Sequence, residues 1–297
     1  MMRTIWALIR RNQKLFFKDK GMFISSMMTP IILIVLYATF LFNVYKDSFV
    51  SSIPDFIHIS KSLINGTVAA QLCAALLAVS CVTVTFCVNL TMVQDKANGV
   101  RKDFDISPIS KSALYIGYLG STILTSILVN FVAFAMCLFY IYKMGWYLSG
   151  MDVLYLFFDM ILIVVFGALL SSVLCFPLKT QGQMSAVGTI VSAGYGFLCG
   201  AYMPISNFSN GLQKFLSYLP STYGTSLLKN HMLQGIFVEM KENGFPKEVI
   251  HKIKDALDCN PTFQGSVVST NTMTTIVLMS IVILFVLYLC VVQYKKK

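Results

Sequence analysis

Long apolar blocks separated by short polar segments dominate the chain. A helix needs about 20 mainly apolar residues to cross a bilayer. Six stretches reach that length: 22–44, 64–92, 113–141, 153–176, 184–203 and 271–292. The pattern therefore predicts an all-α polytopic membrane protein with six transmembrane helices.

The first 21 residues follow a helical period of their own. With side chains about 100° apart around a helix axis, the apolar residues gather on one side. The basic residues share the opposite sector: Arg3, Arg10, Arg11, Lys14 and Lys18. Such a helix lies flat at a membrane interface. We expect residues 1–21 to form a cytoplasmic interfacial helix with Trp6 at the boundary, serving as an anchor alone or also as a platform for a cytoplasmic partner.

The segment 204–270 holds helical patterns too short to span a membrane. Apolar residues repeat at helical spacing over 208–219 and again over about 222–234. Pieces of this length beside the end of a span are typical of re-entrant or interfacial helices. The polar stretch 239–262, in which Pro246 opens a further helix, predicts an extracytoplasmic cap.

Composition supports the membrane class and excludes others. The chain is 56% hydrophobic and 12% charged, with a mean hydropathy of +0.72, whereas soluble domains carry about 25% charged residues. An ordinary soluble enzyme, a disordered tail and a secreted disulfide scaffold are excluded. Seven of the eight cysteines lie in apolar runs without a C-x-x-C pair, so we interpret them as packing residues.

The net charge of +10 follows the membrane topology. With both termini inside, the short cytoplasmic segments hold fourteen Lys and Arg and the short outer loops hold three, as the positive-inside rule requires. We therefore expect a multi-pass protein of the cell membrane with cytoplasmic termini and no nucleic-acid partner. Its parts are the leader 1–21, spans one to five with an inner loop at 93–112 (22–203), the outer loop 204–270, and span six with a basic tail (271–297).

The inner loop 93–112 is longer and more charged than a passive connector requires. Gly99 and the Ser107-Pro108 pair are breakers on either side of one short helical turn. The loop is either a solvated hairpin or a helix offered to a cytosolic protein. In the second interpretation the candidate contact residues are Asp95, Gly99, Arg101, Asp103, Ser107 and Pro108.

Several residues inside the spans call for an explanation. Asp159 lies in span four, where a carboxylate at mid-membrane costs about 2.5–3.5 kcal/mol on insertion scales. It is a proton-coupling acid, a contact on a substrate path, or an acid bonded to a neighbouring helix, and Asn130 is interpreted in the same way. A stripe of small residues in span five predicts close helix packing, within the chain or between subunits: Gly188, Ser192, Gly196 and Gly200.

Nucleotide and metal motifs are missing from the sequence. There is no G-x-x-x-x-G-K-[ST] loop and no H-E-x-x-H. The three histidines, His58, His231 and His251, fall in outer segments and are expected to be surface residues. We expect no catalytic residue, metal or cofactor in this chain.

Two motifs resemble the permease subunit of type-2 ATP-binding-cassette (ABC) exporters. The inner loop is similar to that family's Glu-x-x-x-Gly followed by Ser-Pro-[Val/Ile]-Ser, with Asp95 in place of the acid, Gly99 matching, and a full match over 107–110. Gly200 to Pro204 resembles the family's Gly-x-x-x-Pro, and 219–223 resembles its Leu-Pro-x-Thr-Tyr. The likeness covers nearly the whole chain.

The resemblance implies a mechanism with partners. A separate ABC ATPase, which binds ATP and Mg²⁺, would grip residues 95–110 and the leader helix, and a second identical or related permease chain would complete the path. The cargo would be a drug, an antimicrobial peptide or a lipid-like molecule moved outward. Pro204, Pro220 and Tyr223 come with the outer motifs as candidates near that path. Tyr118 departs from the family, which commonly has a lysine there.

Two other classes remain open on the residues alone. One is a proton-coupled secondary transporter using Asp159, whose transport would survive ATP depletion. The other is a non-transporting membrane sensor or immunity protein that uses 204–270 as a receptor.

Overall fold

The computed structural model describes residues 1–51, 59–263 and 265–294, and these are helical apart from short connections and one small hairpin. The helices up to the middle of the chain are α1 (Met2–Lys18), α2 (Lys20–Leu36), the π-helix η1 (Tyr37–Leu41), α3 (Phe42–Ser51), α4 (Lys61–Ala97), α5 (Val100–Ile106), α6 (Lys111–Met144) and α7 (Gly150–Cys175). The remaining elements are α8 (Gln181–Leu198), the 3-10 helix η2 (Ile205–Asn207), α9 (Asn210–Leu216), α10 (Pro220–Glu242), α11 (Lys247–Ala256), β1 (Thr262–Phe263), β2 (Ser266–Val267) and α12 (Thr270–Tyr294).

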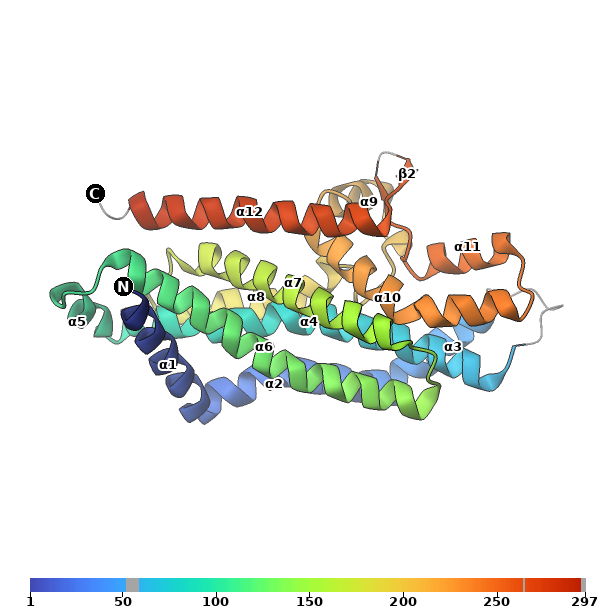
Figure 1. The fold of residues 1–297 in the computed structure, drawn as a ribbon, viewed down its shortest axis with the longest axis horizontal. Coiled ribbons are helices and arrows are strands. Elements are labelled where there is room, and N and C mark those ends of the chain that lie inside the picture. Colours follow the sequence, from blue (N-terminus) through green and yellow to red (C-terminus); the bar gives the residue numbers. More distant parts are fainter. Residues whose placement is uncertain (52–58, 264, 295–297) are drawn as a thin grey trace.

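The long helices run side by side along the molecule, with α4 at the centre (Figure 1). α4 packs against α2, α6, α7, α8 and α10, and most of its side chains are buried. Its sequence allows this because small residues such as Ala69, Ala74 and Ala78 let neighbouring helices approach closely. The α4 helix is therefore the axis around which the others pack.

Five helical segments are long and apolar enough to cross a membrane: Lys20–Asp47, Lys61–Ala97, Lys111–Met144, Gly150–Cys175 and Thr270–Gln293. They confirm the all-α polytopic membrane class. The predicted fifth span, 184–203, forms α8, which is 18 residues long and is not among the five. Its first turn carries Gln181 and Gln183, which lower its mean hydropathy. The count of six spans stays a prediction.

The exposed faces of the helices differ in chemistry. Along the middle of α12 the exposed residues are mostly large and apolar, among them Val282, Ile283 and Val286, as expected of a face that touches lipid chains. On α8, small residues such as Ser185 and Thr189 are exposed beside larger apolar ones such as Ile190, which is 69% exposed. The exposed face of α8 is therefore of mixed composition, whereas that of the middle of α12 is apolar.

The N-terminus, α5 and the last turn of α12 lie at one end of the molecule, and α11 lies at the other (Figure 1). We call these the α5 end and the cap end. At the cap end, α9 and α11 appear where short helices were predicted. The second predicted piece, 222–234, is wrong in length: α10 has 23 residues, because Ile236, Phe237 and Met240 continue its buried face.

Candidate functional site

At the α5 end, three helices meet at a buried carboxylate. Asp95 on α4 accepts hydrogen bonds from both terminal nitrogens of Arg11 on α1, one of them at 2.9 Å. The hydroxyl of Tyr118 on α6 donates to the same carboxylate. These bonds to Asp95 raise the pKa of Arg11. The charges thus tie α1, α4 and α6 together, and we call this cluster the inner tie.

The short helix α5 is fastened on one face and free on the other. Arg101 lies 4.8 Å from the ring centre of Tyr115 on α6, and Arg11 lies 5.2 Å from that of Phe104 on α5, distances at which a cation attracts an aromatic ring. The opposite face is exposed and carries Lys102, Asp103 and Ile106, and Ile106 is 88% exposed. The short helix α5 therefore contacts α1 and α6 on one face while its other face is open.

Two glycines set the geometry at the α5 end, one between α4 and α5 and one where α1 crosses α6. Gly99 has φ +80°, the left-handed conformation that favours glycine, and it separates α4 from α5. Gly117 lies where α1 crosses α6, and a Cβ there would come within 2.8 Å of the Cβ of Leu8. The close crossing brings Arg11 within reach of Asp95.

The predicted contact residues of the inner loop fall into two groups. Asp103 and Pro108 are exposed, and Ser107 is half-buried with its hydroxyl donating to the carbonyl of Phe104 at 2.8 Å. Asp95 and Arg101 instead point into the protein. The carboxylate of Asp95 is buried and already bonded within the chain, so it is not free to bond a partner in this structure, and its part in coupling to an ATPase stays a prediction.

A second buried charge pair lies toward the cap end. Lys229 on α10 donates to Asp258 at 3.2 Å and to the carbonyl of Gly200 at 3.3 Å. Asp258 also accepts from the backbone N–H of Ile205 at 3.1 Å. Both charged side chains are less than a tenth exposed. We call this cluster the cap lock, because it joins α10, the cap and the segment that follows α8.

Asp159 is bonded to a neighbouring helix, one of the three interpretations above. Its carboxylate lies 2.5 Å from Nδ1 of His231 on α10, and Tyr155 stacks on that imidazole at 5.2 Å. The expectation that His231 is a surface residue is wrong, since this bond turns it into the interface between α7 and α10. His251 is exposed as expected, and His58 lies outside the described residues.

Asn130 is a packing residue in this structure. It is fully buried, accepts from the hydroxyl of Ser80 on α4 at 2.7 Å, and donates to the carbonyl of Ser126 at 2.9 Å. Both ends of its amide are therefore bonded inside the helix bundle.

The small residues of α8 divide between two environments. A Cβ on Gly196 would overlap the ring of Tyr202 at 2.3 Å, and Gly200 has φ +70° beside Ile205. Around Gly188, by contrast, no described atom lies within 4 Å of such a Cβ, and Ser192 is exposed. Gly196 and Gly200 therefore pack within the chain, whereas Gly188 and Ser192 face away from the described residues.

The residues of the outer motifs shape the turn into α10. Pro220 occupies its first helical position, where the missing N–H costs nothing. The hydroxyl of Tyr223 donates to the carbonyl of Ser217 at 2.6 Å and closes the turn after α9. Pro204 precedes η2 and lines a cavity of about 430 Å³ with Tyr45 and other residues.

The sequence pattern of the family described as ABC-2 type transporter matches residues 3–233. The chain belongs to the ABC-2 type transporter family. A comparison with curated proteins finds no match. Membership identifies the chain as an ABC transporter permease, a membrane component of transport that is not itself catalytic. This favours the ATP-driven class over the proton-coupled transporter and the sensor.

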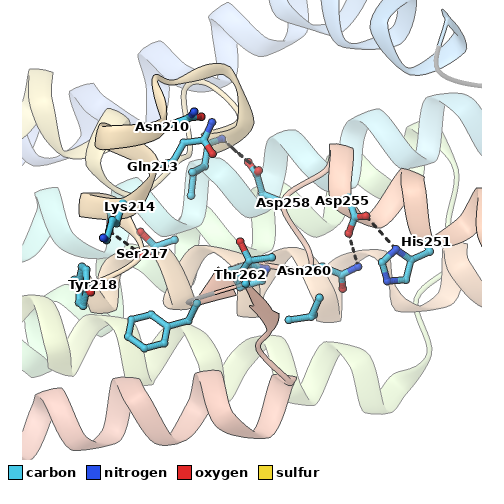
Figure 2. A pocket seen from close by; sticks show the side chains of 16 residues that line it. Asn210, Gln213, Lys214, Ser217, Tyr218, His251, Asp255, Asp258, Asn260 and Thr262 are labelled. Carbon is cyan, nitrogen blue, oxygen red and sulfur yellow. Dashed lines mark hydrogen bonds and ion pairs between the residues drawn. The ribbon is translucent and has the colours of Figure 1, made fainter.

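The permease also carries a pocket of mixed polarity in its cap, which no motif predicted. It has a volume of about 480 Å³ and lies between α9, the end of α11 and the hairpin. Figure 2 shows Asp255 bonded to His251 at 3.0 Å and to Asn260 at 2.8 Å. Tyr218 and Phe263 form an aromatic edge, with ring centres 5.3 Å apart. The pocket combines hydrogen-bonding groups with an apolar side.

Among the described residues of the permease, no group of three or more His, Cys, Asp and Glu side chains could hold a metal ion. The buried charge pairs join α1 to α4 in one case and α10 to the turn after α11 in the other.

Proposed function

We propose that this permease belongs to an exporter of the cell membrane, with the α5 end in the cytoplasm, and that a separate ABC ATPase supplies the energy from ATP and Mg²⁺. The free face of α5 carries this proposal, because its exposed Ile106, Lys102 and Asp103 form a mixed apolar and charged surface at a helix fastened from behind. Such a surface suits docking by a protein.

The contacts that hold α5 also support a route by which a displacement of α5 would reach the other helices. A displacement of α5 bears on Phe104 and Arg101, which contact Arg11 of α1 and Tyr115 of α6. Lys96, one turn before Gly99, donates to the carbonyl of Phe176 at 2.6 Å beyond the end of α7. The ATPase shifts this assembly only as far as it binds one of its two states more tightly.

The exposed face of α8 supports the proposal that a second permease chain, identical or related, packs against this one. Ser185, Thr189 and Ser192 leave polar hydroxyls outside, although Thr189 bonds back to its own helix at 3.0 Å. Small and polar residues favour helix contact or a water-filled path over lipid. Between two such faces a drug, an antimicrobial peptide or a lipid-like molecule would leave the cell.

The test is capture of the ATPase from native membranes by the tagged permease, followed by ATP-driven transport in vesicles. Ile106→Asp should abolish capture and transport, because it places a charge in the apolar centre of the docking face. It should leave insertion intact, since the side chain is 88% exposed. Val267→Asp, at an exposed apolar site of the hairpin, is the matched control. Equal capture by both variants would refute the docking role of α5.

A further inference from the structure

The helix α1 turns one side toward the protein and leaves the other side open. Leu8, Ile9 and Phe16 are buried. Leu8 lies against Gly117 of α6, and Phe16 packs in a cluster with Val84 of α4. An isolated interfacial helix buries its apolar side in lipid, but here neighbouring helices cover most of that side. What α1 offers to its surroundings is therefore the opposite side.

The open side of α1 is strongly basic. It carries four exposed cations, which we call the basic face: Arg3, Arg10, Lys14 and Lys18. They lie along a groove of about 740 Å³, and no acidic side chain is among the described residues that line it. Within the part of the chain that the structure describes, none of the four takes part in an ion pair.

The acids near α1 do not balance this charge. The carboxylate of Asp19 accepts from the backbone N–H of Met22 at 3.1 Å and caps α2. Asp95 is bonded to Arg11 in the inner tie, and Asp103 belongs to the free face of α5. Each cation close to an anionic membrane strengthens binding by about fivefold. A row of four on one helix face therefore fits an anionic surface.

The position of α1 along the molecule sets it level with lipid headgroups. Along the long axis, α1 lies between α5 and the start of α2, and it is steeply inclined to the long helices (Figure 1). α2 begins at Lys20, and Ile24 and Met28 in its first turns are 57% and 47% exposed, as on a surface that touches acyl chains. The acyl chains therefore begin where α1 ends, and the headgroups lie beside it.

One edge of the basic face is aromatic. Trp6 and Phe17 are 48% and 44% exposed, and they share this edge because eleven positions make about three helical turns. Arg10 lies 5.3 Å from the ring centre of Trp6. Aromatic rings beside cations are typical of the boundary between headgroups and acyl chains. An acidic surface in water would pair the cations but leave this edge hydrated, so the arrangement favours a lipid.

We propose that the basic face of α1 binds the headgroups of anionic phospholipids in the leaflet around the α5 end. The lipid phosphates accept hydrogen bonds from the arginines and lysines, a pairing that charge on both sides strengthens. Trp6 and Phe17 lie against the start of the acyl chains. A zwitterionic phospholipid carries its own cation beside the phosphate and gains less. The site is separate from the free face of α5 and goes beyond the proposed coupling to an ATPase.

The chain supplies its own probe for the experiment. It has two tryptophans, Trp6 and Trp146, so Trp146→Phe leaves Trp6 as the only one. This full chain is placed in phosphatidylcholine nanodiscs with a minor fraction of lipid whose acyl chains carry bromine near the glycerol, which quenches tryptophan on contact. Brominated phosphatidylglycerol should quench Trp6 several-fold more than the same fraction of brominated phosphatidylcholine. Equal quenching by the two lipids would overturn the proposal.

Charge variants made in the same Trp146→Phe chain test the basic face itself. The preference for phosphatidylglycerol should disappear when all four cations are removed: Arg3→Gln, Arg10→Gln, Lys14→Gln and Lys18→Gln. A matched control with the same net charge should keep the preference, since it changes exposed lysines toward the cap end: Lys214→Gln, Lys241→Gln, Lys247→Gln and Lys252→Gln.

A milder variant keeps the proposal testable if the fourfold change prevents insertion. Arg10→Gln with Lys14→Gln retains two cations, so the ratio of quenching by the two lipids should fall by less than with all four changes. Comparing the two lipids within one variant removes any direct effect of Arg10 on the fluorescence of Trp6. A preference that persists unchanged in this variant, or that the cap-end control loses equally, would overturn the assignment to the basic face.

Discussion

The two ends of the molecule both rely on a buried carboxylate paired with a cation, but they use it differently. In the inner tie, Arg11 is 30% exposed and its partner Asp95 joins helices that also present a free surface on α5. In the cap lock, Lys229 is only 3% exposed, and Asp258 is bonded to Lys229 and to the backbone of Ile205. Water reaches one pair and is nearly excluded from the other.

This difference predicts that the inner tie can rearrange, whereas the cap lock holds its parts in a fixed position. A partly hydrated arginine keeps much of its solvation when its bonds shift, so the inner tie can alter at moderate cost. A dry lysine and aspartate lose solvation on both sides, and separating them exposes an uncompensated charge to a medium of low polarity. We expect motion at the α5 end to leave the cap lock intact.

Replacing Lys229 with Met should have the largest effect, because it breaks the dry pair and strands Asp258. Removal of one member of a buried pair costs about 3–5 kcal/mol. The fraction of protein that stays monodisperse after heating in detergent should fall steeply, as measured by size-exclusion chromatography. Lys214→Met, which removes an exposed lysine near the same cap, should behave as the native protein.

The double variant Lys229→Met with Asp258→Asn sharpens this test. It removes both charges at once, so most of the lost stability should return. If the double variant were less stable than Lys229→Met alone, the pair would not be the source of the effect.

Replacing Asp95 with Asn should have a smaller effect on stability and a larger one on coupling. Hydrogen bonds to a charged group contribute about 1.5–3 kcal/mol, and water compensates part of the loss at Arg11. Trypsin should cut α1 faster in inside-out vesicles, and ATP-driven transport should fall. The charge exchange Arg11→Asp with Asp95→Arg should slow trypsin again. An unchanged cleavage rate in Asp95→Asn would show that the tie does not hold α1.

The long helices could be predicted from the sequence, whereas the charge pairs could not. An apolar run of sufficient length forms a helix whatever surrounds it, because lipid leaves the backbone no other way to satisfy its hydrogen bonds. Arg11 and Asp95, by contrast, are 84 positions apart, and their pairing depends on the crossing of α1 over α6. The fit of Leu8 against Gly117 that sets this crossing has no signature in either segment alone.

Individual residues of the site also show that pairings between distant segments could not be predicted from the sequence. Tyr118 stands where the family commonly has a lysine. This difference is explained only by the bond from its hydroxyl on α6 to Asp95 on α4. Lys229 follows Leu227 and Leu228 on the buried face of α10, and a lysine in such a position could have indicated a buried partner. His231 offered no signal, since its partner Asp159 lies 72 positions away.

Replacing Gly117 with Ala should disturb the inner tie without touching a charge. The added Cβ would stand 2.8 Å from Leu8, and overpacking of this kind costs about 1–3 kcal/mol. Faster trypsin cleavage of α1 is expected, as for Asp95→Asn. Gly150→Ala is the matched control, because no described atom lies within 4 Å of its Cβ and alanine favours a helix by about 0.5–1 kcal/mol. Similar cleavage rates in Gly117→Ala and Gly150→Ala would show that the close crossing of α1 and α6 does not determine the stability of the inner tie.

The smallest expected signal comes from a thiol beside the cap lock. Burial raises the pKa of Cys259 to about 12, and its backbone carbonyl accepts from the side chain of Asn230 at 2.5 Å. At pH 8 the reactive thiolate is then on the order of one molecule in ten thousand. A membrane-impermeant maleimide should leave Cys259 unmodified in intact cells, and Lys229→Met should make it reactive while Asp95→Asn should not. Labelling of Cys259 in Asp95→Asn as well would mean that the two ends are coupled. It would refute the expected difference between a movable inner tie and a fixed cap lock.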